Sequence, residues 1–131
     1  MQAQTTFYRF EKKYLLSPLS YRRLRRLLAQ RMAEDEYGRY TITSVYFDTE
    51  DYDIIRTSVQ KPVFKEKLRL RWYGEKDEQS DIFWEIKRKY RGRVYKRRIP
   101  MRPAGADRLL QPGGTPGEEQ IAKEVDWFIK R

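Results

Sequence analysis

The chain has 131 residues, a net charge of +10 and an aromatic content of 15%, which predict one folded, basic domain and exclude an intrinsically disordered chain. It contains neither cysteine nor histidine, which excludes disulfides, thiolate or imidazole metal ligands and histidine acid–base chemistry. The positive charge favours a polyanionic partner, and a metal would need carboxylates and substrate oxygens as ligands, which suits Mg²⁺ or Mn²⁺.

The first part of the chain predicts two strands with a helix between them. Residues 6–16 alternate and are rich in aromatics, which is typical of a strand. Ser17 and Pro18 have the types expected at the N-cap and first position of a helix, and apolar residues follow at helical spacing. Residues 40–48 are dense in β-branched and aromatic side chains and predict a second strand, followed by a turn or short helix over 51–58.

The remainder predicts three further strands and a final helix. The strands are expected at 63–73, 82–90 and 93–99, with a polar hairpin loop at 74–81 and a tight turn at Arg91-Gly92. Pro100 and Pro103 are expected to end the last strand. A mobile loop rich in Pro and Gly is predicted at 111–117, and an amphipathic helix at 118–130. The predicted fold class is therefore α+β with an antiparallel sheet.

The predicted strands carry charged residues at alternate positions. Residues two apart in a strand share a face, so each charged row lies opposite an apolar row, as in residues 67–72. Four strands contribute such rows: Arg9, Glu11 and Lys13; Lys67, Arg69 and Arg71; Glu85, Lys87 and Lys89; and Lys96 with Arg98. If these strands are neighbours, like charges face one another and destabilise the sheet, which a bound polyanion would offset.

Two other interpretations of the rows stay open at this point. A charged alternate face is commonly the solvated side of an antiparallel sheet. A nucleic-acid interface would place aromatics on the basic face for base stacking, whereas Trp72 and Trp84 alternate to the opposite side, which argues against nucleic acid as partner. Tyr46 is expected in the core or in a cavity wall, and Ser44 has no base that would make it a nucleophile.

Four segments together resemble the VTC domain, a polyphosphate polymerase domain of the triphosphate tunnel metalloenzyme (CYTH-like) superfamily. They are RFEKKYLLS, SVYFDT, KEKLRLRWYG and FWEIKRKYRGRVYKRR, and the resemblance extends from about Phe7 to Arg131. It implies an antiparallel β-barrel flattened into a tunnel, with helices on the outside and Lys, Arg and Glu in the lumen. It also implies that the tunnel binds triphosphate or polyphosphate with Mn²⁺ or Mg²⁺.

The resemblance also assigns roles to individual residues. Arg9, Glu11 and Lys13 occupy the place of a Glu-x-Glu-x-Lys signature whose first glutamate is Arg9 in this chain. The residues implied in catalysis are Lys13, Arg69, Arg71 and Lys87. The residues implied in phosphate binding are Arg9, Lys67, Lys89, Lys96 and Arg98. The residues implied as metal ligands are Glu11 and Glu85.

The implied activity is transfer of the terminal phosphate of ATP to a growing polyphosphate chain. Domains that this sequence resembles continue beyond the last predicted helix, so residues 1–131 are expected to form one VTC-like domain that is the N-terminal half of a longer one. The open sheet edge would then pair with the second half or with another copy in a homodimer. A polyphosphate or inositol-phosphate sensor without catalysis is the alternative. No segment of the sequence is apolar enough to span a membrane, and no signal peptide is recognised, so a cytoplasmic location is expected.

Overall fold

The computed structural model describes residues 6–10 and 12–131. The described residues form two compact units: a sheet unit of residues 6–10 and 41–131, and a helical unit of residues 12–40. The helical unit contains α1 (Pro18–Ala29), which begins as predicted: Ser17 is the N-cap, and its Oγ accepts a hydrogen bond from the Ser20 backbone N–H at 3.1 Å. None of the residues of α1 is buried.

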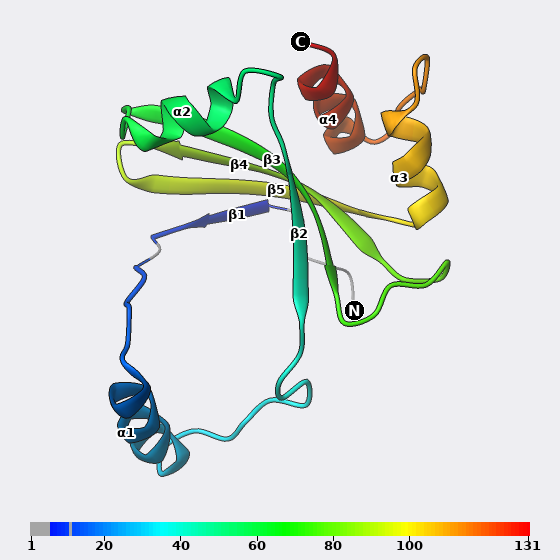
Figure 1. Ribbon diagram of the computed structural model, residues 1–131. Helices are drawn as coiled ribbons and strands as arrows, with labels where there is room; N and C mark the ends of the chain where they lie inside the picture. The colour runs from blue at the N-terminus through cyan, green and yellow to red at the C-terminus, as the bar shows by residue number, and fades with distance from the viewer. Residues whose placement is uncertain (1–5, 11) are drawn as a thin grey trace. The chain divides into compact units, whose positions relative to one another are not determined.

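The sheet unit contains one antiparallel sheet in the order β1-β5-β4-β3-β2, which Figure 1 shows together with the helices. The strands are β1 (Thr6–Arg9), β2 (Ile42–Phe47), β3 (Phe64–Tyr73), β4 (Ile82–Tyr90) and β5 (Arg93–Met101). The helices of this unit are α2 (Asp53–Val59), α3 (Pro103–Leu110) and α4 (Gln120–Lys130). Among the described residues β1 and β2 are the outer strands and do not pair with each other, so the described sheet is open. The α+β class and the antiparallel sheet are thus confirmed.

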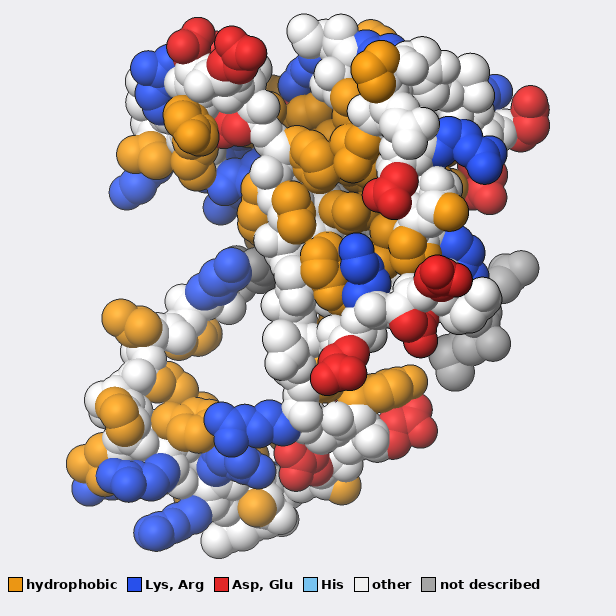
Figure 2. Space-filling model, turned by 45° about the vertical axis from the view of Figure 1, so that its right-hand side comes forward, with side chains coloured by type: hydrophobic (Ala, Val, Ile, Leu, Met, Phe, Trp, Pro, Cys, Tyr) orange, Lys and Arg blue, Asp and Glu red, His pale blue; other side chains and the backbone are white. Residues whose placement is uncertain are grey.

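The core lies between one face of the sheet and the helices α3 and α4. Leu68, Trp84 and Ile86 of the central strands are buried there, and Val125 and Phe128 of α4 pack against them. In Figure 2 hydrophobic side chains gather beside the helices, with charged side chains around them. Because neighbouring residues in a strand point to opposite faces, burial of Leu68 and Ile86 on this face sends the residues between the apolar positions to the other face.

Basic side chains on the helix-covered face are matched by acids. The Nε atom of Arg88 lies 3.2 Å from a carboxylate oxygen of Glu66, and the Nε atom of Arg97 lies 3.2 Å from a carboxylate oxygen of Glu124 in α4. Arg88, which interrupts the apolar alternation of its strand, is therefore paired on this face. The other basic side chains of the central strands, among them Lys67, Lys87 and Arg69, belong to the opposite face.

The predicted ends of the first and the last strand differ from the structure. The first strand ends at Arg9 and does not reach residue 16. Arg9 pairs with Val94, and β5 begins at Arg93, so β5 offers no further strand residues with which β1 could pair beyond this point. The last strand passes through Pro100 and ends at Met101, because the described part of β1 reaches only to Arg97, and a proline is tolerated where no neighbouring strand needs its N–H.

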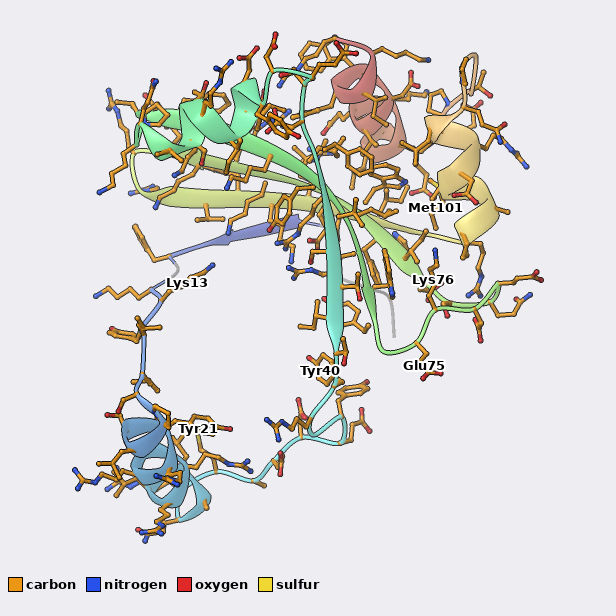
Figure 3. All side chains as sticks on the ribbon, in the orientation of Figure 1. Lys13, Tyr21, Tyr40, Glu75, Lys76 and Met101 are labelled. Carbon is orange, nitrogen blue, oxygen red and sulfur yellow. The ribbon has the colours of Figure 1, made fainter. Side chains whose placement is uncertain are left out.

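The short helix α3 was not predicted. It begins at Pro103, which occupies the first turn of the helix, where its missing N–H costs nothing. Ala106 and Leu109 then lie three residues apart and are both buried. Figure 3 shows Met101 at the end of β5, just before this helix, and shows Glu75 and Lys76 in the loop between β3 and β4.

Candidate functional site

The strand register brings three lysines side by side. Lys67 of β3 lies opposite Lys87 of β4, which in turn lies opposite Lys96 of β5. The adjacent row on the same face contains Arg69, Glu85 and Arg98 in the same order across the three strands. Like charges directly opposite one another destabilise a sheet, so this arrangement needs a compensating negative charge. We call this surface the basic face: Lys67, Arg69, Arg71, Glu85, Lys87, Lys89, Lys96 and Arg98.

Glu85 supplies part of that compensation. Its side chain is fully buried, and its carboxylate accepts a charge-assisted hydrogen bond from Nε of Arg69. The other carboxylate oxygen lies 3.1 Å from Nζ of Lys96, and Nε of Arg71 lies 4.0 Å from the carboxylate. Burial opposes ionisation of Glu85, but Arg69 and Lys96 outweigh it and hold the pKa of Glu85 below its ordinary value. Glu85 is therefore ionised at neutral pH.

Lys96 responds to the same surroundings in a different way. Burial disfavours the charged form of Lys96 and lowers its pKa. The neighbouring carboxylate of Glu85 raises this pKa but offsets the effect of burial only in part, and the positive charge of Arg69 lowers the pKa further. The side chain keeps an exposed fraction of 12%. An approaching anion would therefore meet a partly desolvated ammonium group, whose electrostatic interactions are stronger than those of a solvated lysine.

The edge strand β2 supplies two hydroxyl groups to the basic face. The hydroxyl of Tyr46 accepts a hydrogen bond from Nη1 of Arg69 at 3.0 Å, and Oγ of Ser44 accepts one from Nε of Arg71 at 3.0 Å. Burial raises the pKa of Tyr46, but its hydrogen bond from Arg69 and the nearby positive charges prevail and leave the pKa lowered. Both hydroxyls hold guanidinium groups in place.

These two hydroxyl residues were not assigned a role from the sequence. The expectation that Tyr46 lines a cavity wall agrees with its position, since it lines a pocket described below. The signal that could have found both is the alternation of β2, which places Ser44 and Tyr46 on one face and Val45 on the other.

Aromatic rings also lie on the basic face. Nζ of Lys67 lies 5.9 Å from the centre of the Tyr46 ring, and the guanidinium carbon of Arg98 lies 4.9 Å from the centre of the Phe83 ring. Trp84 is fully buried on the opposite face and Trp72 packs against the core there, as the alternation predicted. The basic face is thus poorer in aromatics than the opposite face but is not devoid of them.

The remaining predicted site residues lie outside β3, β4 and β5. Arg9 lies opposite Val94 in the backbone register of β1 and β5, while its side chain and the whole of Glu11 lie outside the part of the chain that the structure describes. Lys13 belongs to the helical unit, on the segment before α1 that Figure 3 shows, and its side chain is exposed. The sequence predicts Arg9, Glu11 and Lys13 on one face of one strand. Because β1 ends at Arg9, this prediction is wrong for Lys13.

The described residues do not fit a metal ion. Within residues 6–10 and 12–131, no group of three acidic side chains converges. The carboxylate of Glu85 is surrounded by Arg69, Arg71 and Lys96, and these cations take the place that a metal would need. The chemistry that the basic face itself offers is therefore the binding and orientation of anionic oxygens.

Comparison with known families matches the model of the VTC domain to residues 8–129, and this range covers nearly the whole chain. Placement in the CYTH-like superfamily is consistent with this match, and VTC domains are generally metal-dependent. No curated protein and no solved structure matches significantly. Of the described helices, none combines the length and apolarity required to cross a membrane.

Proposed function

The chain belongs to the VTC domain family, which implies a role related to polyphosphate polymerisation, and from this premise we propose that the basic face binds triphosphate and polyphosphate. The observation that carries the proposal is the lysine row Lys67, Lys87 and Lys96 beside a row that contains Arg69 and Glu85. Adjacent strands are about 4.8 Å apart, so the three lysines span about 10 Å, which suits several linked phosphates better than one.

The proposed binding mode assigns two kinds of task to these residues. Arg69 and Arg71 are positioned by Tyr46, Ser44 and Glu85, so their forked guanidinium groups are presented in fixed orientations. Lysine ammonium groups act as point charges on flexible stems and follow an irregular chain of oxygens. The fixed arginines would orient one phosphate, while Lys67 and Lys87 neutralise its neighbours.

We further propose that a completed site transfers a phosphoryl group. The terminal oxygen of a polyphosphate chain would attack the γ-phosphorus of ATP, forming a new P–O bond while the bond to the β-phosphate oxygen breaks and ADP leaves. Arg69, Arg71 and Lys87 would stabilise the negative charge on the transferring group, with Lys13 assigned to the same task by the family resemblance. Arg9, Lys67, Lys89, Lys96 and Arg98 would hold the rest of the chain. Completion would come from a second polypeptide segment or another copy that covers the basic face.

A second candidate function is binding without turnover, as in a sensor for polyphosphate or inositol phosphates. The observation that favours it is the carboxylate of Glu85, which is committed to cations and does not present a metal ligand. A sensor needs only the anion-binding part of the arrangement. The two candidates share the basic face and differ in whether ATP is consumed.

The binding proposal is tested by calorimetric titration with tripolyphosphate, long-chain polyphosphate and a DNA duplex, each with and without Mn²⁺ or Mg²⁺. The test variant is Lys67→Gln/Lys87→Gln on the basic face. The matched control is Arg108→Gln/Lys123→Gln, which removes the same charge from exposed positions on α3 and α4. We expect tripolyphosphate affinity to fall about 100-fold in the first variant, from two lost charge-assisted contacts, and to change little in the control.

Equal losses in both variants would show that net charge alone attracts the ligand. Tighter binding of DNA than of long-chain polyphosphate, unaffected by Lys67→Gln/Lys87→Gln, would contradict the proposal. A separate assay then distinguishes the two candidates: ADP release from ATP in the presence of polyphosphate and a divalent metal supports transfer. Binding without ADP release supports the sensor.

A further inference from the structure

A pocket of about 430 Å³ lies where β2 ends and α2 begins. Its lining combines aromatic and aliphatic side chains with one ammonium group and one carboxylate, and it includes Tyr46, Asp48, Tyr52, Ile54, Ile55 and Lys67. The exposed fraction is 66% for Tyr52 and 44% for Ile55, so both lining residues are accessible from solvent. Pockets of this size with mostly apolar walls and few polar groups are typical of small-molecule sites.

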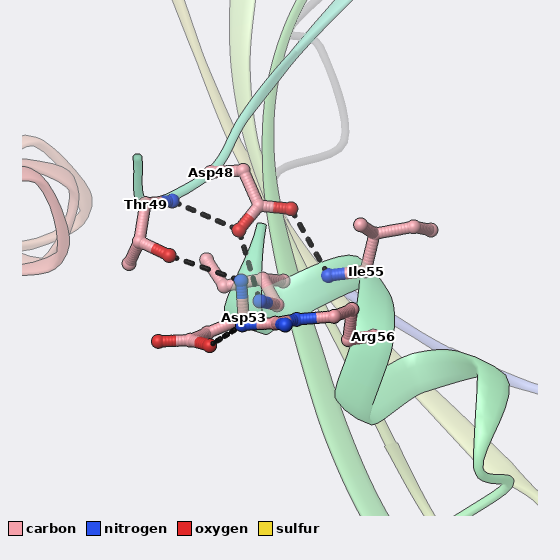
Figure 4. A network of polar contacts seen from close by, with 6 residues as sticks. Asp48, Thr49, Asp53, Ile55 and Arg56 are labelled. Carbon is pink, nitrogen blue, oxygen red and sulfur yellow. Dashed lines mark hydrogen bonds and ion pairs between the residues drawn. The ribbon is translucent and has the colours of Figure 1, made fainter. Parts of the chain in front are cut away.

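The wall formed by α2 is held by local hydrogen bonds. One carboxylate oxygen of Asp48 accepts from the backbone N–H groups of Thr49 and Ile54, at 2.8 and 2.9 Å, and the other accepts from the N–H of Ile55 at 3.0 Å. Oγ1 of Thr49 accepts from the N–H of Asp53 at 3.0 Å. Figure 4 shows this network around the start of the helix. The first turn of α2 is therefore fixed against the end of β2.

Tyr52 precedes the helix in a left-handed conformation, with φ of 57°. A non-glycine residue rarely adopts this conformation, because the β-carbon then crowds the backbone. The turn that Asp48 and Thr49 fix is what holds it. The result is that the tyrosine ring lines the pocket.

The pocket and the basic face share two residues. Tyr46 lines the pocket with its ring, while its hydroxyl accepts a hydrogen bond from Arg69 at 3.0 Å. Lys67 also lines the pocket, and in the strand register it lies opposite Lys87 in the lysine row. A ligand with an apolar planar part next to a row of phosphates could therefore occupy both surfaces at once.

We propose that this pocket receives the base of a nucleoside triphosphate whose phosphates lie on the basic face. The inference rests on the proposed phosphate binding and adds a nucleoside subsite to it. The purine or pyrimidine ring would stack on Tyr52 or Tyr46 and contact Ile55, and Lys67 would contact the phosphate nearest the nucleoside. The pocket thereby gives the protein a means to distinguish a nucleotide donor from inorganic polyphosphate.

The test compares ATP with tripolyphosphate by calorimetry on the same variants of the 131-residue chain. Tyr52→Ala and Ile55→Ala each remove one wall of the pocket without changing the charge of the basic face. Val59→Ala is the matched control, because Val59 is an exposed apolar residue of the same helix outside the pocket lining. Thermal unfolding of each variant checks that the fold is retained.

We expect the dissociation constant for ATP to rise about tenfold in Tyr52→Ala, the loss typical of one base–aromatic contact, and to rise in Ile55→Ala as well. The dissociation constant for tripolyphosphate should stay the same in both. Unchanged ATP affinity in both folded variants overturns the subsite and leaves phosphate binding intact. Equal losses for ATP and tripolyphosphate overturn it too, since the pocket would then act only on the phosphates. Failure of wild type to bind either ligand overturns the subsite together with the function it rests on.

Discussion

At the scale of single residues, Glu85 sets the charge balance of the basic face. It is fully buried, and its carboxylate forms ion pairs with Arg69 and Lys96, while Nε of Arg71 lies 4.0 Å from a carboxylate oxygen. Taking a carboxylate out of water is costly, and here the cost is offset because each oxygen has a cationic partner. The same contacts hold Arg69 and Lys96 in place in the absence of a ligand. Glu85 is thus a positioning residue for the groups proposed to bind phosphate.

Replacing Glu85 with Gln should destabilise the protein strongly. The substitution keeps the shape but leaves the buried Arg69 and the mostly buried Lys96 side chain without their carboxylate, and the loss of one partner of a buried ion pair typically costs about 3 to 5 kcal/mol. Urea denaturation measures the free energy of unfolding. Glu78→Gln, in the exposed loop between β3 and β4, is the control and should change that free energy by less than about 0.5 kcal/mol. A loss below about 1 kcal/mol in Glu85→Gln would contradict the role assigned to Glu85.

The lowered pKa of Lys96 predicts how anion binding depends on pH. Lys96 should lose its proton below the ordinary lysine pKa of about 10.4, and the pKa of Tyr46 is lowered as well, so alkaline pH removes one positive charge and adds one negative charge. The contribution of Lys96 and Tyr46 to tripolyphosphate affinity should therefore be constant near neutral pH and fall before about pH 10.4 is reached. Titrations across this range measure the decline.

Lys96→Arg provides the matched comparison for that decline. Arginine stays protonated throughout, so the part of the pH dependence that Lys96 causes should disappear in this variant. An identical decline in wild type and Lys96→Arg would assign the effect to other groups.

Much of the basic face could be predicted from alternation alone. Lys67, Arg69 and Arg71 were placed opposite Leu68 and Leu70 because residues two apart share a face, and the burial of Leu68 agrees with this. The sequence could not indicate that Glu85 would be fully buried among cations, because that depends on the register of three strands. The sequence also did not indicate the hydrogen-bond partners of Ser44 and Tyr46. Ser44 and Arg71 are 27 residues apart in the sequence, and Tyr46 and Arg69 are 23 residues apart.

At the scale of elements, the β4–β5 hairpin fixes the register on which the lysine row depends. Tyr90 pairs with Arg93, so Arg91 and Gly92 form a two-residue turn, with φ of 48° and 80°. Positive φ at both central residues matches the right-handed twist of the flanking strands. A slip of one residue in this hairpin would move Lys87 and Lys96 to opposite faces.

Gly92→Ala should lower the stability of the hairpin, because an alanine at positive φ costs about 1 kcal/mol or more. Gly117→Ala is the matched control: Gly117 has no positive φ, and no atom lies within 4 Å of the position of an added β-carbon. The free energy of unfolding should fall in the first variant and stay the same or rise in the second. Equal effects in both variants would indicate that Gly92 is not required for the turn.

The central hairpin was also the best-predicted part of the fold. The strand at residues 82–90 and the Arg91-Gly92 turn were confirmed, since dense β-formers and a glycine after a charged residue are strong local signals. The errors occurred where tertiary context decides. β1 is short because β5 begins at Arg93, and β5 continues through Pro100 because β1 does not cover that part of it. The sequence predicts Pro103 as a residue that ends a strand, and in the structure it begins α3.

At the scale of the whole molecule, the sheet unit separates two kinds of surface. One face is covered by α3 and α4, and there Arg88 and Arg97 have acidic partners. The other face collects basic side chains from three strands around the carboxylate of Glu85. The positive charge of the sheet unit is therefore distributed unevenly between its two faces, and within this unit a polyanion should bind at the basic face.

The central claim is that phosphate chains bind at the basic face, and amine-labelling footprinting tests it most directly. The protein is treated with an amine-reactive reagent with and without tripolyphosphate, and modification at each lysine is quantified by mass spectrometry. Lys67, Lys87 and Lys89 lie on the basic face, whereas Lys123 and Lys130 lie on α4. The account predicts that tripolyphosphate protects Lys67 and Lys87 and leaves Lys123 and Lys130 as reactive as before. Protection of Lys123 and Lys130 without protection of Lys67 and Lys87 would contradict it.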